Sequence, residues 1–164
     1  MKLKTIQLLI LFFLIFQFSK AQVAKDSELY QEILKIDQLI FEDGFNNCRF
    51  DSVQNVMHKD MVFYHDKGGI SYEEDFLKSM KQNICSTPNK KPIRKLTKQS
   101  FDVYPLYDNG KLYGAIQVGI HEFFIKEPNK ELYKTNIAKF THTYLLENET
   151  WKLKVILSYD HQEP

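Results

Sequence analysis

The feature that most constrains the fold is the stretch of residues 139–161, where side chains of opposite character alternate along two long runs. Between the runs lies Glu147-Asn148-Glu149-Thr150, a polar sequence typical of a turn. Alternation with a period of two residues is typical of strands that cover one face. The stretch therefore predicts a β-hairpin whose strands span 131–146 and 151–161.

One face of this hairpin carries polar and aromatic side chains that could serve a binding or catalytic site. The residues expected on that face are Phe140, His142, Tyr144, Trp151, Tyr159 and His161. A symmetric turn places His142 and His161 about six residues apart along the strands, roughly 20 Å. These two histidines therefore cannot bind one metal ion, and we expect no metal site.

The sequence Ser158-Tyr159-Asp160-His161 also suggests a serine-hydrolase triad. Strict alternation turns Ser158 and Asp160 to the face opposite His161, whereas a triad needs convergent side chains. No glycine-flanked serine elsewhere forms a nucleophile elbow. The alternation therefore excludes the triad.

Upstream of the hairpin the pattern is first helical and then extended. Apolar residues recur at helical spacing over 26–47, with Asp26 or Ser27 as the N-cap. Two shorter helices are expected over 51–58 and 72–83, and the other strands over 61–66, 95–106 and 112–126. Helices that come early and antiparallel strands that come late predict an α+β domain, with the helices covering one face of a curved sheet.

The first 21 residues are predicted to be a secretory signal peptide. A basic start with Lys2 and Lys4 precedes an apolar run over 6–18, and Ser19-Lys20-Ala21 supplies small residues before the cleavage point. The apolar run is short for a membrane span, so a cleaved signal is favoured over an anchor. We therefore expect an exported, periplasmic or secreted protein with a single domain over 22–164 and no membrane attachment after cleavage.

Charge and cysteine content narrow the partners and the chemistry. The chain has 22 basic and 21 acidic residues, interspersed along the sequence, which does not favour nucleic acid as a partner. Export would place Cys48 and Cys85 in an oxidising compartment, where they could form one disulfide worth roughly 3–4 kcal/mol. The alternative is two buried, unpaired thiols. No histidine lies near either cysteine in the sequence, so a catalytic cysteine is not expected.

The order of elements resembles the nuclear transport factor 2-like superfamily, and within it the SnoaL-like and ketosteroid-isomerase-like small domains. The resemblance rests on a strand ending Tyr64-His65-Asp66 and on a final strand that opens with Trp151-Lys152-Leu153 and reaches Ser158. It covers nearly all of 22–164. It implies a cone-shaped sheet with three N-terminal helices packed on its concave face, a pocket there, and often a homodimer.

The resemblance also implies a place for the strand that ends at Asp66. This strand should run beside the last strand, so that Tyr64, His65 or Asp66 approaches Tyr159 or His161. A histidine held by a carboxylate is a common general base, because its unperturbed pKa lies near neutrality. The superfamily includes isomerases, cyclases, dehydratases and members without known activity, so the fold does not give the function.

The position of His121 depends on the register of the hairpin around Glu127-Pro128-Asn129-Lys130. A symmetric turn pairs His121 with Asn136 and places it near His161, on the same face as Gln117. A shift of one residue turns His121 to the opposite face, near Asp160. The sequence leaves both registers open.

Three functions are compatible with these observations. The first is a module that binds a small hydrophobic molecule, with Tyr64, His121, Phe140, His142, Tyr144 and Trp151 as its ligand-binding residues. The second is an isomerase or dehydratase with His65 or His161 as base, Asp66 as the carboxylate, and Tyr64 or Tyr159 as donor. The third is a protein-interaction domain that acts through its sheet. None of them requires a cofactor.

Overall fold

The computed structural model describes residues 22–97 and 99–164, so the predicted signal peptide lies outside the described residues. Helix α2 (Glu28–Asp37) begins after Ser27, whose hydroxyl accepts a hydrogen bond from the backbone N–H of Tyr30. It continues without a break into the π-helical segment η1 (Gln38–Asn46), which confirms the long helix predicted over 26–47. Within the described ranges, no helix is long and apolar enough to cross a membrane.

Seven strands of the described ranges form one curved sheet, in the order β2-β1-β7-β6-β5-β3, with β4 also paired to β5. The strands are β1 (Met57–His65), β2 (Gly69–Tyr72), β3 (Lys91–Leu96), β4 (Asp102–Asp108), β5 (Lys111–Lys126), β6 (Tyr133–Glu147) and β7 (Thr150–Gln162). Strand β1 lies beside β7, as the resemblance implies, but runs parallel to it. The sheet is therefore mixed, whereas the sequence predicts an antiparallel one.

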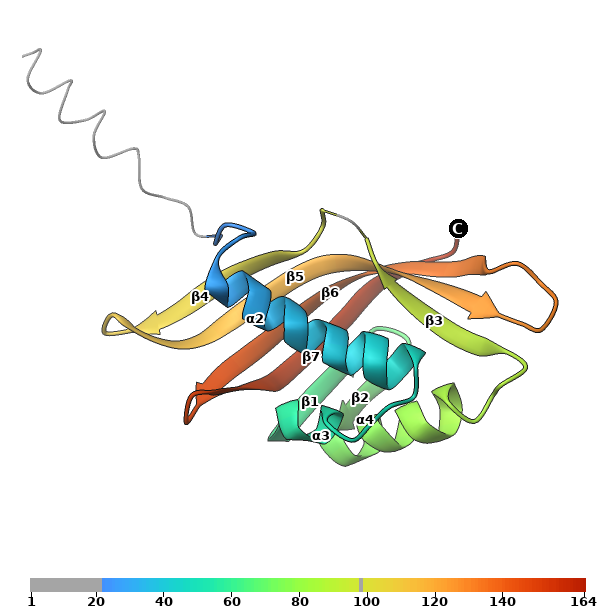
Figure 1. Cartoon of the computed structure of the whole chain (residues 1–164), viewed down its shortest axis with the longest axis horizontal. Coiled ribbons are helices and arrows are strands. Elements are labelled where there is room, and N and C mark those ends of the chain that lie inside the picture. Colours follow the sequence, from blue (N-terminus) through green and yellow to red (C-terminus); the bar gives the residue numbers. More distant parts are fainter. Residues whose placement is uncertain (1–21, 98) are drawn as a thin grey trace, which may run out of the picture.

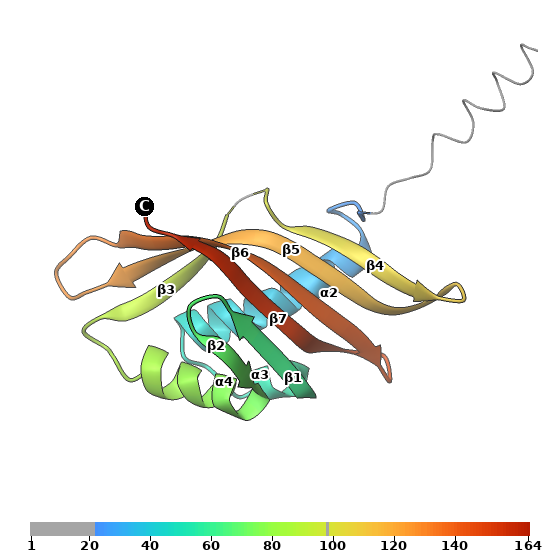
Figure 2. The ribbon, with the colours of Figure 1, turned by 180° about the vertical axis from the view of Figure 1, so that it is seen from behind.

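The helices cover one face of this sheet. Helix α2 crosses β5, β6 and β7, while α3 (Val53–Val56) and α4 (Glu73–Ser79) lie beside β1 and β2 (Figure 1). Helix α4 continues as η2 (Met80–Ile84). From behind, strands β4 to β7 lie in front of α2 (Figure 2). This arrangement confirms the α+β architecture with three helices against the concave side of the sheet.

The core lies between α2 and the sheet. Helix α2 and η1 bury Ile33 and Ile40 completely, against Met61 of β1 and Leu153 of β7. Their spacing of seven residues puts both isoleucines on one helical face, as the amphipathic pattern predicts. This packing fixes η1 above the centre of the sheet.

Three elements differ from the sequence expectation. The strand predicted over 95–106 is interrupted by a turn at Thr97, whose carbonyl accepts the backbone N–H of Ser100, so it becomes β3 and β4. The helix predicted over 51–58 is only the single turn α3, because Met57 already pairs with Leu153 of β7. Strand β2 was not predicted, and it forms by hairpin pairing with the end of β1. Tertiary pairing overrides the local pattern at α3, whereas a local turn and a local hairpin account for the other two differences.

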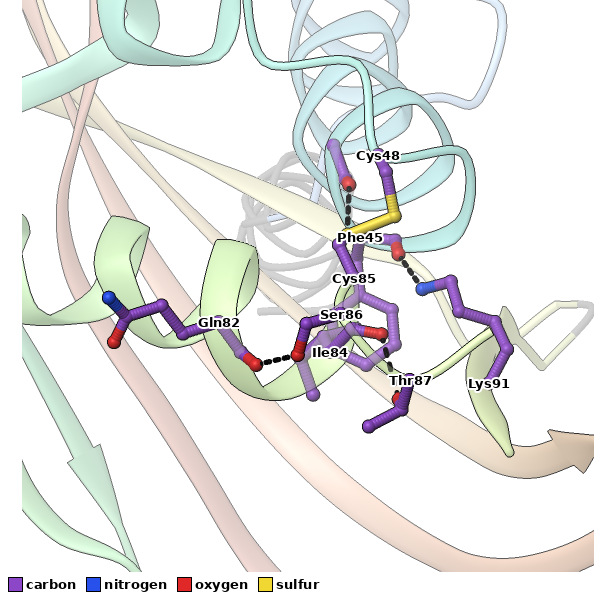
Figure 3. Close-up of a disulfide and its surroundings, with 9 residues drawn as sticks. Phe45, Cys48, Gln82, Ile84, Cys85, Ser86, Thr87 and Lys91 are labelled. Carbon is purple, nitrogen blue, oxygen red and sulfur yellow. Dashed lines mark hydrogen bonds between the residues drawn. A yellow bond between two sulfur atoms is a disulfide. The ribbon is translucent and has the colours of Figure 1, made fainter. Parts of the chain in front are cut away.

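The predicted disulfide is present. Cys48, just after η1, is bonded to Cys85, just after η2, with 5.8 Å between their Cα atoms (Figure 3). Nearby, the Lys91 ammonium donates to the carbonyl of Phe45, which ties β3 to the same corner. The bond joins the ends of the two helical segments, and no free cysteine remains among the described residues.

Bulges in the last two hairpins decide which side chains face inward. Between β6 and β7, pairing is symmetric as far as Tyr144 opposite Leu153 and then shifts by one residue at Lys154. A second irregularity occurs at Asp160, whose φ of 59° lies in the left-handed region. Each extra residue reverses the alternation of β7. The inward residues at its end are therefore Ile156, Ser158 and His161.

A third bulge settles the register of His121. Thr135 is the extra residue in β6 opposite Phe123 and Phe124 of β5. His121 then pairs with Ala138, two residues from the Asn136 partner that the symmetric register predicts, and its side chain is buried. The two-residue displacement keeps His121 on the inward face with Gln117, as in the first of the two registers.

Candidate functional site

A cavity of about 450 Å³ lies between η1, α4 and the concave face of the sheet. Its apolar wall consists of Phe41, Phe45, Phe63, Phe76, Met80, Ile84, Pro92, Phe123 and Ile156. Its polar wall consists of His65, Lys67, Ser71, Ser79, His121, Asn136, His142, Ser158 and His161. An apolar wall with a limited set of polar groups is typical of sites for small organic molecules.

A set of polar residues that we call the buried network (Asp37, Arg94, Gln117, His142 and Tyr144) adjoins this cavity. The guanidinium of Arg94 donates to both carboxylate oxygens of Asp37, at 2.8 and 3.1 Å. The amide of Gln117 donates to Asp37 Oδ1 at 2.9 Å. All five residues are almost fully buried. The ion pair is therefore closed off from water and compensated within the protein.

Hydrogen bonds within the network fix the protonation of His142. Gln117 Oε1 accepts from the hydroxyl of Tyr144 at 2.6 Å and lies 3.0 Å from His142 Nδ1. An amide oxygen only accepts, so Nδ1 carries the proton and Nε2 is left as an acceptor. Burial lowers the pKa of His142 to about 3, which keeps the ring neutral. Burial also raises the pKa of Tyr144 well above its usual value.

Two acceptors on the cavity wall are buried without a hydrogen-bond partner among the described residues. They are Nε2 of His142 and Oδ1 of Asn136. An unpartnered buried polar atom costs about 1–3 kcal/mol. A ligand that donates hydrogen bonds would remove that cost.

A second set of polar residues, the serine chain (Asp66, His161, Ser158 and His121), comprises three residues of the cavity wall and Asp66 at its edge. Asp66 Oδ1 is 2.6 Å from His161 Nδ1, and Oδ2 accepts the backbone N–H of His161 at 3.1 Å. The Ser158 hydroxyl lies 3.4 Å from His161 Nε2 and 3.3 Å from His121 Nε2. The backbone N–H of His161, together with its side chain, lowers the pKa of Asp66, so this carboxylate is charged.

The side chain of His65 packs flat against that of His161, with ring centroids 4.4 Å apart. His65 Nδ1 accepts the backbone N–H groups of Lys67 and Gly68, at 3.1 and 3.0 Å. Burial and the neighbouring His161 lower the pKa of His65. A neutral ring with Nδ1 as acceptor carries its proton on Nε2, so His65 can donate one hydrogen bond.

His65, Asp66 and His161 offer ligand atoms within 4.8 Å of one another, close enough for a metal ion. However, Nδ1 of His65 already accepts two backbone N–H groups, and Nδ1 of His161 is bonded to Asp66. A metal ion would have to displace these bonds. The arrangement therefore fits a hydrogen-bonded cluster better than a metal centre.

The structure brings part of the predicted site together. His65, His121, His142 and His161 all line the cavity, and Asp66 supports His161 from its edge. Tyr64 and Tyr159 do not line it, because they point outward and are 45% and 39% exposed. Strand alternation turns Tyr64 away between Phe63 and His65. The bulge at Asp160 turns Tyr159 away from His161.

Three predicted ligand-binding residues have packing roles in place of direct contact with the cavity. Phe140 is fully buried between the rings of His121 and His142. Tyr144 belongs to the buried network. Trp151 donates its indole N–H to Glu32 of α2 at 2.8 Å and packs in the core.

The sequence did not predict the ion pair between Asp37 and Arg94. Its alternation also placed Ser158 on the face opposite His161, which is wrong. A signal for Asp37 was available, because it lies on the apolar helical face with Ile33 and Ile40. The exclusion of a Ser158–His161 contact is wrong, since it assumed unbroken alternation and the Asp160 bulge breaks it. The sequence could not show that Asn136 Oδ1 and His142 Nε2 are buried without a hydrogen-bond partner among the described residues, because this depends on tertiary contacts.

No protein-family model matches the chain, and no curated protein matches it. Solved structures do match. ActVI-ORFA from Streptomyces coelicolor superimposes with a TM-score of 0.67 at 8% identity, over 83% of this chain and 98% of that one.

Two further matches carry other descriptions. An NTF-2-like protein of unknown function from Shewanella oneidensis MR-1 gives a TM-score of 0.56 at 16% identity, over 79% of this chain and 98% of its own. A putative calcium/calmodulin-dependent protein kinase II association domain from Xanthomonas campestris gives a TM-score of 0.61 at 15% identity. The match covers 85% of this chain and 93% of that one. At these identities the likeness concerns the fold, and the chain has the nuclear transport factor 2-like fold.

Proposed function

We propose that this domain binds a small, flat, mainly apolar molecule that carries a hydrogen-bond donor. The cavity has the volume and the aromatic walls that such a ligand needs. The observation that carries the proposal is the unpartnered Nε2 of His142, a buried acceptor on the cavity wall whose protonation is fixed by Gln117. A donor on the ligand would satisfy it.

The donor requirement can be tested with two matched probes, 2-naphthol and 2-methoxynaphthalene, which differ in the O–H group. We expect 2-naphthol to bind more tightly by calorimetry, and His142→Phe to weaken it about three- to tenfold, the value of one hydrogen bond. The methoxy probe should respond little to the same variant. Equal affinity of wild type for both probes would contradict the donor requirement.

The location of the site can be tested by blocking the cavity. Ser79 of α4 lines it, whereas its neighbour Lys78 does not. Ser79→Trp should therefore abolish 2-naphthol binding, and Lys78→Trp on the same helix should leave it unchanged. Chemical-shift changes that fall outside the cavity in wild type would place the ligand elsewhere.

A second candidate function is proton transfer by His161, the general base of an isomerase or dehydratase. It is supported by the short contact between His161 Nδ1 and Asp66. The predicted donors, Tyr64 and Tyr159, give no support because both are exposed. The test is exchange of the α-protons of 2-tetralone in D₂O, followed by NMR, where His161→Phe should return the rate to background.

We also propose that the domain works outside the cytosol and that it forms a homodimer. Export is supported by the disulfide between Cys48 and Cys85 and by the sequence pattern of residues 1–21. Self-association is supported by large exposed side chains on strands, including Tyr64 and Tyr159. Cell fractionation tests the first proposal, and light scattering of purified residues 22–164 tests the second.

A further inference from the structure

The serine chain places three side chains in the order that acyl transfer requires. The carboxylate of Asp66 holds His161 through both the ring Nδ1 and the backbone N–H, at 2.6 and 3.1 Å. The opposite ring nitrogen, Nε2, faces the hydroxyl of Ser158 at 3.4 Å. In a structure without substrate, a contact of this length between a nucleophile and its base is still compatible with catalysis.

The hydrogen bonds of His121 determine to which histidine the hydroxyl of Ser158 donates its proton. Its Nδ1 accepts a hydrogen bond from Arg94 Nε at 3.4 Å, which leaves the ring proton on Nε2. Burial and the charge of Arg94 lower the pKa of His121 to about 2, so the ring is neutral. Nε2–H therefore donates to Ser158 Oγ, 3.3 Å away. The serine's own proton is left to donate to His161 Nε2.

We propose that Ser158, His161 and Asp66 form a catalytic triad that hydrolyses small apolar esters held in the cavity, an inference that rests on the proposed function of the cavity. Ser158 and His161 are the catalytic residues, and Asp66 is a positioning residue. His121 orients the nucleophile by its hydrogen bond. Nucleophile, base and orienting carboxylate are the three groups that a triad requires.

The reaction consists of two balanced steps. In the first, Ser158 Oγ attacks the ester carbonyl while its proton moves to His161 Nε2, and the alcohol leaves with that proton. In the second, His161 takes a proton from water, the hydroxide attacks the acyl-serine, and Oγ recovers the proton from His161. The net change is ester plus water to acid plus alcohol, without an oxidant or reductant.

Two side chains on the cavity wall can donate to the oxyanion that forms in each step. His65 carries its proton on Nε2, because Nδ1 accepts two backbone N–H groups. Asn136 can turn its amide NH₂ inward by rotation about its last bond, since its oxygen has no partner to hold it. Donors at such positions stabilise the charge of a tetrahedral intermediate.

The experiment uses 2-naphthyl acetate, whose alcohol product is the binding probe 2-naphthol, and a fluorophosphonate as the covalent probe. We expect purified residues 22–164 to release 2-naphthol and to take one phosphonyl group on Ser158, located by peptide mass spectrometry. Ser158→Ala should lower the hydrolysis rate about a thousandfold or more and abolish labelling. Ser52→Ala is the control, because Ser52 is exposed and its side chain caps no helix.

Asp66→Asn tests positioning against a merely structural role. It should lower kcat with little change in KM, and it should move the acidic limb of the pH profile to lower pH, because the imidazolium loses a neighbouring negative charge. Asp160→Asn is its control, since Asp160 pairs on the surface with Lys139 and its left-handed backbone suits asparagine.

The outcomes separate this inference from the proposed function. If 2-naphthol binds to wild type and to Ser158→Ala alike, but the ester is not hydrolysed and no adduct forms, the triad is overturned and the binding function stands. If Ser158 is labelled and the ester is cleaved although free 2-naphthol does not bind, the triad is supported and the binding function fails. Hydrolysis that persists in Ser158→Ala overturns the triad.

Discussion

The buried network and the serine chain adjoin the same cavity and are joined by one hydrogen bond, from Arg94 to His121, yet they differ in how their charges are compensated. In the buried network, Asp37 and Arg94 neutralise each other away from water. In the serine chain, the side chain of Asp66 is 30% exposed and no lysine or arginine pairs with it among the described residues. Its partner is the imidazole of His161, whose Nδ1 lies 2.6 Å from Asp66 Oδ1.

This difference separates a structural role from a chemical one. A buried, closed ion pair resists change because removing one partner strands the other in a medium of low polarity. A carboxylate at the surface tolerates removal, since water replaces its partner. We therefore expect substitutions in the buried network to act mainly on stability, and substitutions in the serine chain to act mainly on reactivity.

The largest effect is expected from Asp37→Asn, which leaves the guanidinium of Arg94 buried and uncompensated. The free energy of unfolding should fall by about 3–5 kcal/mol, measured by urea denaturation. Asp43→Asn is the matched control, because Asp43 pairs with Arg49 on the surface, and it should cost less than about 1 kcal/mol. Equal losses of unfolding free energy in the two variants would show that the buried ion pair is no more important for stability than the surface pair.

The next effect is expected from removing the disulfide with the double variant Cys48→Ser, Cys85→Ser. The chain-entropy model gives a loss of about 3–4 kcal/mol for a loop of this length. Because η1 and η2 supply Phe45, Met80 and Ile84 to the cavity wall, 2-naphthol should also bind more weakly. Unchanged unfolding in urea, with or without reductant, would show that the bond adds no stability.

A smaller effect, per unit of pH, is expected from the buried histidines. The pKa values of His121 and His142 fall to about 2 and about 3, while in the unfolded chain both bind a proton near pH 6.5. Their contribution is therefore present above pH 6.5 and is lost as the pH falls toward 3, by up to about 1.4 kcal/mol per pH unit for each ring.

The variant His142→Phe isolates one of these titrations. Below pH 6.5 the slope of unfolding free energy against pH should fall by up to about one proton in this variant. Urea denaturation at several pH values measures it. A slope that His142→Phe leaves unaltered would mean that His142 binds its proton as readily in the folded protein as in the unfolded chain.

A further effect on stability is expected where the two polar regions share a wall. A Cβ on Gly119 would come within 2.6 Å of the Phe140 ring, which lies between His121 and His142. Gly119→Ala should cost about 1–3 kcal/mol through this overlap. Adding Phe140→Leu shortens the ring and should recover part of that loss relative to Phe140→Leu alone. A double-mutant cycle with no coupling energy would show that the two residues are independent.

Much of the fold could be predicted from periodicity. The helix over 26–47 and the hairpin over 131–161 follow from apolar residues spaced for a helix and for strands, because burial of one face selects these two periods. The pairing of β1 with β7 was implied by resemblance, but its parallel direction was not foreseen. The short strand β2 was missed, since its four residues are too few to show a clear alternation.

The candidate site was less predictable, because single extra residues decide it. His161 faces inward as predicted only because two bulges in β7 reverse its alternation twice. The first of these reversals, at Lys154, places Ser158 inside and Tyr159 outside, against the expectation. Local sequence gives little warning of either bulge, because Lys154 and Asp160 are ordinary residues in a polar, alternating strand.

The sequence by itself determined the order of the long elements, their amphipathic faces and the presence of histidines near the end of the sheet. It did so because burial of apolar side chains is set by spacing along one chain. The tertiary structure alone decided which polar side chains converge. Register, bulges and the partner of each carboxylate depend on contacts between distant segments, and a shift of one residue moves a hydroxyl from the surface into the cavity.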